Sequence, residues 1–469
     1  MSFSHKVKEI FGDLAVDKSL TLRHEVGRLP RFISEYLLSL YSGKESGFEK
    51  LSQAIREFYP ESKDKDKVLY KIKRNLKIRL IDEFKVSVDV KKDLYKLEIP
   101  SLQINDALAD ERVVRNCEGL LSGIWGLGTL TYFPEILVSS PEGEGKKAPT
   151  PIALTSLEPF QVYNVDLSEF AEKRKKFTKQ EWIDLLITSI GLNPEVYAQE
   201  QKQLLLLRLV PLVENNVNLL ELGPRATGKT YLYRNASYYT RIYAGGLVSP
   251  ARLFFDARIK VVGDIGTRDA VIFDEIARIE FGNPAEMIGK LKDFMVDGFF
   301  ERGSLKRAHS VCSLVFLGNL DEPPTAQAVI NALPAFMKDI AFLDRIHGLI
   351  PGWKLPKIMK SEVHLAKGYG LAADYFAQIM HELRQVNLQE RLRKRVKLGE
   401  DFTIRDERAI FRLAEGMLKI MHPDGEAGAR EIEEAIDLAT KSRQGVADLL
   451  CELAPAEFPP KRLKYEVLE

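Results

Sequence analysis

The segment from Gly223 to Thr230, GPRATGKT, has the residue types and spacing that bind nucleotide phosphates. It follows the apolar run VNLLEL, so we expect a strand, a tight turn and then a helix. Glycines let backbone N–H groups close around phosphates, and the helix N-terminus adds a positive dipole. We predict that Lys229 reaches the β and γ phosphates of ATP and that the Thr230 hydroxyl binds Mg²⁺. The predicted nucleotide-binding residues are Gly223, Pro224, Arg225, Ala226, Thr227, Gly228, Lys229, Thr230 and Tyr231.

Two adjacent carboxylates end a later apolar run, AVIFDE, from Ala270 to Glu275. Asp274 would hold the Mg²⁺ ion through water, and Glu275 would act as the general base that polarises the attacking water. The alternatives are that the carboxylates only cap a strand and that the glycine-rich turn carries its lysine incidentally. Because both motifs occur in this order in one chain, ATP hydrolysis is the favoured interpretation.

Asn319 is a third polar side chain at the end of an apolar run, SLVFL, which is followed by Gly318. At the tip of a strand beside the phosphate loop, an asparagine can orient the attacking water and contact the γ phosphate. We therefore count Asn319 among the catalytic residues with Lys229 and Glu275. An ordinary turn asparagine is the alternative.

Two basic segments could contact a nucleic-acid backbone. Residues 297–311, DGFFERGSLKRAHSV, predict a β-hairpin with Lys306 and Arg307 at a basic tip. Between Lys67 and Arg79 there are six basic residues and no acidic one. Charges that only keep a hairpin or a helix face solvated are the alternative in both cases. The predicted DNA contacts in the second segment are Lys71, Lys73, Arg74 and Lys77.

Hydrophobic periodicity indicates the elements that must position these residues. Thr178 and Glu181 form a capping box that opens a helix running through Ile190. The stretch from Ser139 to Pro151 reads as an exposed loop. Two early helices are predicted over Leu29–Tyr41 and Val68–Ile81, and the strands of a small β-barrel or sheet over Phe84–Val90, Leu94–Ile99, Leu120–Tyr132 and Phe160–Val165.

These elements predict an α/β protein. Its core would be a P-loop ATPase domain, a parallel sheet with helices on both faces, followed by a helical lid. A mixed α/β N-terminal domain with a small barrel-like part would precede it. The predicted boundaries are 1–82 for a mostly helical part, 83–175 for the β-rich part, 176–203 for a linker helix, 204–355 for the core, 356–454 for the lid and 455–469 for a tail.

Composition excludes several classes of protein. The 469 residues are 45% hydrophobic and 29% charged, which is typical of globular domains and excludes wholesale disorder and collagen-like structure. The net charge of +1 means that any nucleic-acid contact must be local. Three scattered cysteines give neither a disulfide framework nor a zinc site. With no secretory signal and no bilayer-spanning run, we expect a cytoplasmic protein without a membrane partner.

The order of the motifs, completed by Asp344 and Arg345 in FLDRIHG, resembles the AAA+ class of ATPases. The resemblance implies that Arg345 is an arginine finger for a neighbouring subunit's nucleotide, with an Asp344–Arg345 salt bridge as the alternative. The sequence Gly428-Ala429-Arg430 resembles the second sensor of Lon-type members, which implies a γ-phosphate contact by Arg430. The alternative there is a surface salt bridge to Glu433 or Glu434. In the Lon and minichromosome-maintenance branch, a hairpin before sensor one points into the ring's central channel.

The segments ELGPRATGKT, DEIARI, LKDFMVDGFFERG, FLGN and FLDRIHGLIPGW closely resemble BrxL, the family of Lon-like AAA+ proteins of BREX phage-defence systems. The resemblance is specific over about residues 204–353 and weaker elsewhere. It implies a homo-hexamer, with stacking into a dodecamer as a further expectation, that binds double-stranded DNA and acts with other BREX components. Longer members carry a protease domain after the lid. The short stretch after Arg430 leads us to expect an ATPase without peptidase activity.

The predicted function is a ring-forming ATPase that translocates on or remodels DNA in phage defence. Two alternatives remain open at this point. One is a protein unfoldase that grips its substrate with Phe299 and Phe300, and the other is a scaffold whose assembly is gated by nucleotide.

Overall fold

The computed structural model of the chain describes residues 2–22, 26, 29–41, 47–59, 62–90, 92–121, 123–134, 150–160, 165–258, 260–320 and 324–468. The chain divides into two compact units. The barrel unit is Leu20–Asn164, and the sheet unit is Met1–Ser19 with Val165–Glu469. The first nineteen residues, predicted as part of an N-terminal domain, therefore belong with the second half of the chain.

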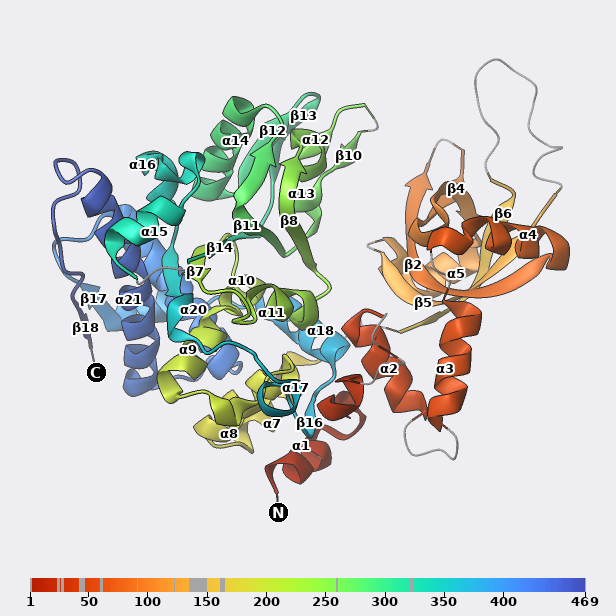
Figure 1. The fold of residues 1–469 in the computed structure, drawn as a ribbon, viewed down its shortest axis with the longest axis horizontal. Helices are drawn as coiled ribbons and strands as arrows, with labels where there is room; N and C mark the ends of the chain where they lie inside the picture. Colours follow the sequence, from red (N-terminus) through yellow and green to blue (C-terminus); the bar gives the residue numbers. More distant parts are fainter. Residues whose placement is uncertain are drawn as a thin grey trace. The chain divides into compact units, whose positions relative to one another are not determined.

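A five-stranded parallel sheet organises the sheet unit (Figure 1). Its strands lie in the order β15 (Gly348–Pro351), β7 (Asn218–Gly223), β14 (Ser313–Asn319), β11 (Ala270–Phe281) and β8 (Thr240–Val248). Successive residues of the central strands point to opposite faces, and both faces are buried. On β14, for example, Val315 faces one hydrophobic core and Phe316 the other, where its ring stacks on that of Phe273 at 5.2 Å.

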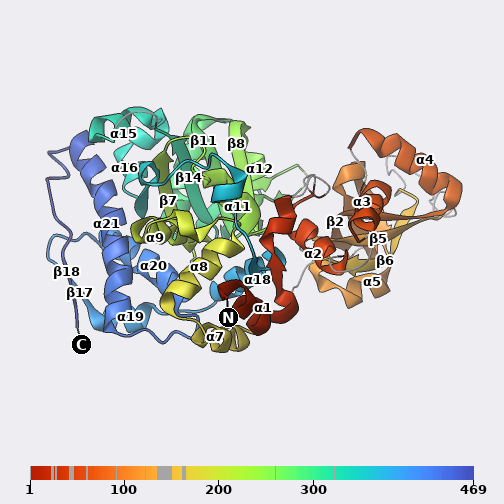
Figure 2. The same ribbon diagram turned by 60° about the horizontal axis from the view of Figure 1, so that its bottom comes forward.

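Helices cover both faces of this sheet, as the sequence predicts. Figure 2 turns α8 and α9 toward the viewer, with strands of the sheet behind them. The helices in the core on this face are α1 (Phe3–Phe11), α7 (Leu167–Lys175), α8 (Lys179–Ser189), α9 (Gln199–Leu207), α10 (Val210–Val213), α11 (Lys229–Ala236), α18 (Ala373–Leu383), α19 (Gln389–Arg395), α20 (Ile404–Met421) and α21 (Ala429–Leu453). Those in the core on the other face include α12 (Pro250–Leu253), α13 (Asp264–Thr267), α14 (Pro284–Asp297), α15 (Ala326–Ala332) and α16 (Ile340–Leu343).

Both ends of the chain are built into the sheet unit. Strand β1 (Ala15–Asp17) pairs with β16 (Tyr369–Leu371), which follows α17 (Ser361–His364). Strand β18 (Tyr465–Val467) pairs with β17 (Val396–Leu398), and Leu463 is buried. The segment predicted as a C-terminal tail is thus held in place by strand pairing and apolar burial. No helix in the described part of the chain is long and apolar enough to cross a bilayer.

The barrel unit contains the predicted small β-barrel. Five strands close in the order β2-β3-β4-β6-β5 around buried side chains such as Phe84, Leu97 and Leu130. These strands are β2 (Lys77–Asp89), β3 (Leu94–Ile99), β4 (Ile104–Ala109), β5 (Ile124–Tyr132) and β6 (Ile152–Pro159). The accompanying helices are α2 (Arg31–Tyr41), α3 (Gly47–Phe58), α4 (Lys65–Asn75) and α5 (Glu111–Asn116).

The helix predicted over Val68–Ile81 is wrong at its C-terminal end. Helix α4 stops at Asn75 because Leu76 adopts a left-handed conformation with φ of 60°, and β2 begins at Lys77. Pairing of β2 with both β3 and β5 outweighs the local helical pattern. The predicted loop from Ser139 to Pro151 and the predicted strand from Phe160 to Val165 fall mostly outside the described residues.

Candidate nucleotide-binding site

The loop from Gly223 to Thr230 connects β7 to α11 at the carboxyl edge of the sheet, the usual ligand-binding edge of an open α/β sheet. Ala226 and Gly228 have positive φ angles of 63° and 78°, which turn the chain sharply into the helix. Gly223 has a different reason to be glycine. A Cβ atom there would collide with the backbone of Gly352 and Trp353, which pack directly against it.

Lys229 and Asn319 come together inside this loop. The Lys229 ammonium donates hydrogen bonds to the carbonyls of Gly223 and Pro224, each at 2.8 Å, and lies 3.4 Å from Asn319 Oδ1. Parallel pairing of β14 with β7 aligns Asn319 with Gly223. Two residues predicted from separate motifs are thus neighbours because adjacent strands end at the same edge.

Thr230 and Asp274 form the second close pair. The Thr230 hydroxyl donates to Asp274 Oδ2 at 2.5 Å, and Asp274 Oδ1 accepts the backbone N–H of Glu275 at 2.9 Å. Hydroxyl and carboxylate oxygens are hard ligands, and Mg²⁺ is usually held by one or two such groups together with substrate phosphates and water. The donor set therefore fits Mg²⁺ bound with a nucleotide.

Glu275 occupies a strained position beside this pair. Its φ angle is 52°, and the pairing of β11 with β8 shifts register between Asp274 and Ile279. Non-glycine residues in this conformation cluster at functional sites. Its carboxylate lies 3.2 Å from Arg278 Nη1, in an ion pair that is largely exposed to solvent.

Arg345 lies at the opposite edge of the sheet. The Asn218 side chain at the start of β7 donates to the Arg345 carbonyl at 3.0 Å, whereas the 223–230 loop leaves the other end of the strand. The two ends of β7 are separated by about 16 Å at 3.3 Å per residue. The alternative Asp344–Arg345 salt bridge is not formed, since Asp344 pairs with Arg443 and Arg405.

Arg430 is not brought to the 223–230 loop. Its side chain is 85% exposed, and its Nε lies 3.5 Å from Glu434 Oε1, one turn along α21. The γ-phosphate contact predicted for Arg430 stays a prediction. The surface salt bridge that was its alternative is present.

Arg208, at the end of α9, is a supporting residue that lies outside every predicted motif. Its fully buried guanidinium binds Glu221 at 2.9 Å and 2.5 Å and donates to the Thr227 carbonyl of the loop at 3.1 Å. The sequence does indicate this ion pair, because Arg208 and Glu221 are each the single charged residue in an apolar run, LLLLRLV and VNLLEL. Such isolated charges predict a buried pair.

The predicted hairpin is present as β12 (Phe299–Arg302) and β13 (Leu305–His309). Lys306 and Arg307 are exposed, and the Arg307 guanidinium lies 4.4 Å from the centroid of the Phe299 ring. Phe300 is buried against Phe254 and Phe294, so it is not available as a gripping aromatic. This packing removes half of the aromatic pair on which the unfoldase alternative depends.

Basic residues of the barrel unit border a groove between α3, α4 and β2. Lys71, Lys77 and Arg79 line it together with Phe58. The Arg79 guanidinium lies 5.7 Å from the Phe58 ring centroid and pairs with Glu158 at 2.7 Å. Lys73 and Arg74 are exposed on α4, directly after the buried Ile72.

Two family models match this chain. Residues 152–464 match the family model described as the ATPase domain of Lon-like protease BrxL-like proteins. Residues 9–132 match the model for the N-terminal domain of the BREX system Lon protease-like protein BrxL. The chain belongs to the BrxL family. This confirms the resemblance seen in the sequence, and an ATPase domain implies that members use a nucleotide.

Two relatives match over nearly the whole chain. The Lon-like protease BrxL of Escherichia coli O9:H4 (strain HS) is 35% identical over 467 residues, which cover 97% of this chain and 65% of the relative. The Lon-like protease BrxL of Bacillus cereus (strain H3081.97) is 32% identical over 473 residues, covering 98% and 68%. The chain thus spans about two thirds of the length of these BrxL relatives.

Proposed function

We propose that this chain is an AAA+ ATPase subunit that assembles into a ring, binds DNA and uses ATP hydrolysis to translocate on it or remodel it in BREX-type phage defence. The observation that carries the proposal is the convergence of Lys229, Thr230, Asp274 and Asn319 at the carboxyl edge of one parallel sheet. Membership of the BrxL family supports the defence context.

Residues of the 223–230 loop and Tyr231 would hold the phosphates of ATP. Lys229 would exchange the carbonyls of Gly223 and Pro224 for phosphate oxygens, and Thr230 and Asp274 would hold the Mg²⁺ ion. When bound, Mg²⁺ neutralises phosphate charge during transfer. Burial of Lys229 and Asp274 strengthens their electrostatic effect on a ligand.

Glu275 would accept the proton of the attacking water, and Asn319 would orient that water. Glu275 must leave its exposed ion pair with Arg278 to do so, and this costs little because surface pairs contribute at most about 1 kcal/mol. The backbone of Glu275, with its positive φ angle, is hydrogen-bonded to the Asp274 carboxylate.

The position of Arg345 supports a ring. It lies at the edge of the sheet opposite the 223–230 loop, so it is poorly placed to serve its own nucleotide. We expect the ring to be a homo-hexamer, or two such hexamers stacked into a dodecamer. In it, Arg345 would contact the neighbouring subunit's nucleotide as an arginine finger.

DNA would be contacted by the two basic surfaces. Lys306 and Arg307 are exposed at the hairpin, and stacking on Phe299 supports the Arg307 guanidinium. In the barrel unit the contacts would come from Lys71, Lys73, Arg74 and Lys77. Contacts of this kind bind the phosphate backbone of duplex DNA without reading its sequence.

The deciding experiment is the steady-state ATPase rate with and without duplex DNA, on protein whose oligomer mass is measured in the same buffer. We expect DNA to stimulate the rate of a hexamer or dodecamer, with Lys229→Ala as the inactive control. No stimulation and no DNA retained by the ring would contradict the proposal and favour a protein substrate or a nucleotide-gated scaffold. The expected lack of peptidase activity stays a prediction, to be checked with casein and ATP.

A further inference from the structure

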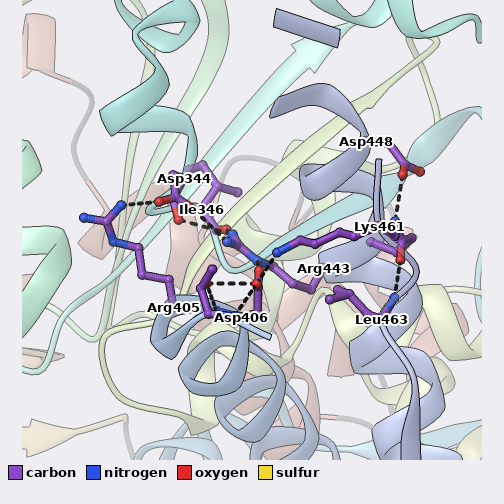
Figure 3. A network of polar contacts seen from close by, with 10 residues as sticks. Asp344, Ile346, Arg405, Asp406, Arg443, Asp448, Lys461 and Leu463 are labelled. Carbon is purple, nitrogen blue, oxygen red and sulfur yellow. Dashed lines mark hydrogen bonds and ion pairs between the residues drawn. The ribbon is translucent and has the colours of Figure 1, made fainter. Parts of the chain in front are cut away.

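A single buried arginine of α21, Arg443, holds the backbone on both sides of Arg345 (Figure 3). Its Nη1 donates to the carbonyl of Asp344 at 3.2 Å and to that of Ile346 at 2.5 Å. Its Nη2 donates to Asp344 Oδ1 at 2.8 Å. The Arg345 carbonyl accepts from Asn218 at 3.0 Å. Three successive carbonyls around the predicted finger are therefore fixed by side chains from elsewhere in the fold.

The Arg345 side chain is held much less firmly than its backbone. Its Nη1 donates to the Ala341 carbonyl of the preceding turn, and its Nε has no hydrogen-bond partner among the described residues. Arg405 binds Asp344 Oδ2, which leaves both oxygens of that carboxylate occupied by other arginines. This arrangement fixes the backbone from which the Arg345 side chain extends and leaves its guanidinium able to bind an anion.

The same arginine reaches the C-terminal segment through Asp406. Arg443 Nε donates to Asp406 Oδ1 at 2.7 Å, and Lys461 Nζ donates to Asp406 Oδ2 at 2.5 Å. Burial opposes ionisation of this carboxyl, yet Arg443 and Lys461 lower its pKa to about 2, so Asp406 is charged at neutral pH. The Gln444 side chain also binds the Lys461 carbonyl and the Leu463 N–H. The segment beyond α21 is thus tied to the network that carries Arg345.

We propose that Arg443 is a positioning residue for Arg345, and that Lys461 of the C-terminal segment supports the same function through Asp406. The inference rests on the proposed function, in which Arg345 serves a neighbouring subunit. When the backbone of an arginine is fixed, its side chain has less conformational freedom to lose on binding the transition state. A chain in which this network is broken should bind ATP normally but hydrolyse it slowly.

The test is Arg443→Gln in the full chain, compared with Arg345→Ala and the double variant. We expect Arg443→Gln to lower kcat about tenfold or more, with nucleotide affinity and oligomer mass unchanged. In the Arg345→Ala background the same change should have no further effect, because the two residues act as one unit. Lys441→Ala is the matched control, since Lys441 is on the same helix but is exposed and forms an ion pair with Asp437, outside the Arg443 network. It should keep the wild-type rate.

Lys461→Met provides a milder variant should Arg443→Gln fail to fold. It removes one of the two cations on Asp406, and we expect a decrease in kcat of about threefold that again disappears in the Arg345→Ala background. Equal losses with and without Arg345, or a wild-type rate in both variants, would overturn the positioning role. Wild-type turnover of Arg345→Ala would instead refute the proposed arginine finger, which separates the two failures.

Discussion

Arg208 and Glu221 form a bidentate ion pair in which both side chains have 0% exposure. The remaining Arg208 nitrogen donates to the Thr227 carbonyl, so the pair connects strand β7 directly to the 223–230 loop. Gly352 packs against the Glu221 carboxylate and allows no side chain there. Loop geometry thus depends on a charge pair inside the sheet unit.

Arg208→Met should destabilise the sheet unit by about 3–5 kcal/mol, because it leaves the Glu221 carboxylate buried without a partner. Urea unfolding measures this loss. The double variant Arg208→Met with Glu221→Leu should recover most of the stability but not the affinity for a fluorescent ADP, since Thr227 still lacks its donor. A stability loss below about 1 kcal/mol in the single variant would contradict this account.

Glu275→Gln should lower ATP turnover by about 100-fold or more while ATP binding persists, because an amide cannot accept the proton of the attacking water. Radiolabelled ATP hydrolysis and equilibrium binding separate the two effects. Glu280→Gln is the control, since Glu280 is exposed on the same strand. Intact turnover in Glu275→Gln would show that another group is the base.

Rings that mix Glu275→Gln with Arg345→Ala subunits should recover ATPase activity that neither variant has alone. In such rings an Arg345→Ala subunit keeps its own hydrolytic residues and can receive Arg345 from a Glu275→Gln neighbour. The rate is measured as a function of mixing ratio after subunit exchange. Activity that stays at the level of the unmixed variants would exclude action of Arg345 between subunits.

Lys306→Ala with Arg307→Ala should weaken duplex DNA binding and reduce the slope of log affinity against log salt by about 2, the change expected for two lost phosphate contacts. Fluorescence anisotropy at several salt concentrations provides both values. Lys175→Ala with Lys441→Ala removes the same charge from exposed helix positions and should leave the slope unchanged. Equal slopes in both double variants would place the DNA contact elsewhere.

Asp82 should make the barrel unit less stable as the pH rises. Burial, with a contribution from Glu83, raises its pKa to about 6, so the stabilising protonated form is complete below about pH 4 and lost as the pH passes 6. Asp82→Asn should therefore stabilise the unit at pH 8, by at most about 3 kcal/mol, and have little effect at pH 4. Pulse proteolysis in urea, following peptides of residues 77–132, measures the difference. An unchanged or lowered stability at pH 8 would contradict it.

The residues proposed to hydrolyse ATP could be picked out from the sequence because each lies in a short motif with its own local geometry. GPRATGKT follows the carboxyl end of β7, FLGN ends β14, and AVIFDE carries its carboxylates to the point where the pairing of β11 with β8 shifts register. Parallel pairing of these strands brings the three positions together. The small barrel was predictable from residue alternation. The end of α4 was not, because the apolar residues near Leu76 fit a helix or a strand, and pairing within the barrel decides between them.

The sequence by itself determined the family and the α/β class, and it indicated Lys229, Thr230, Asp274 and Asn319 as the polar residues of one site. Only the tertiary structure decided that Arg345 lies at the far edge of the sheet, that Arg430 pairs with Glu434 and that the C-terminal segment docks through Lys461. The physical reason is that these outcomes depend on which buried charges meet across the fold. Arg443 and Asp344, separated by 99 residues, meet only after the chain has packed, and no local pattern specifies that contact.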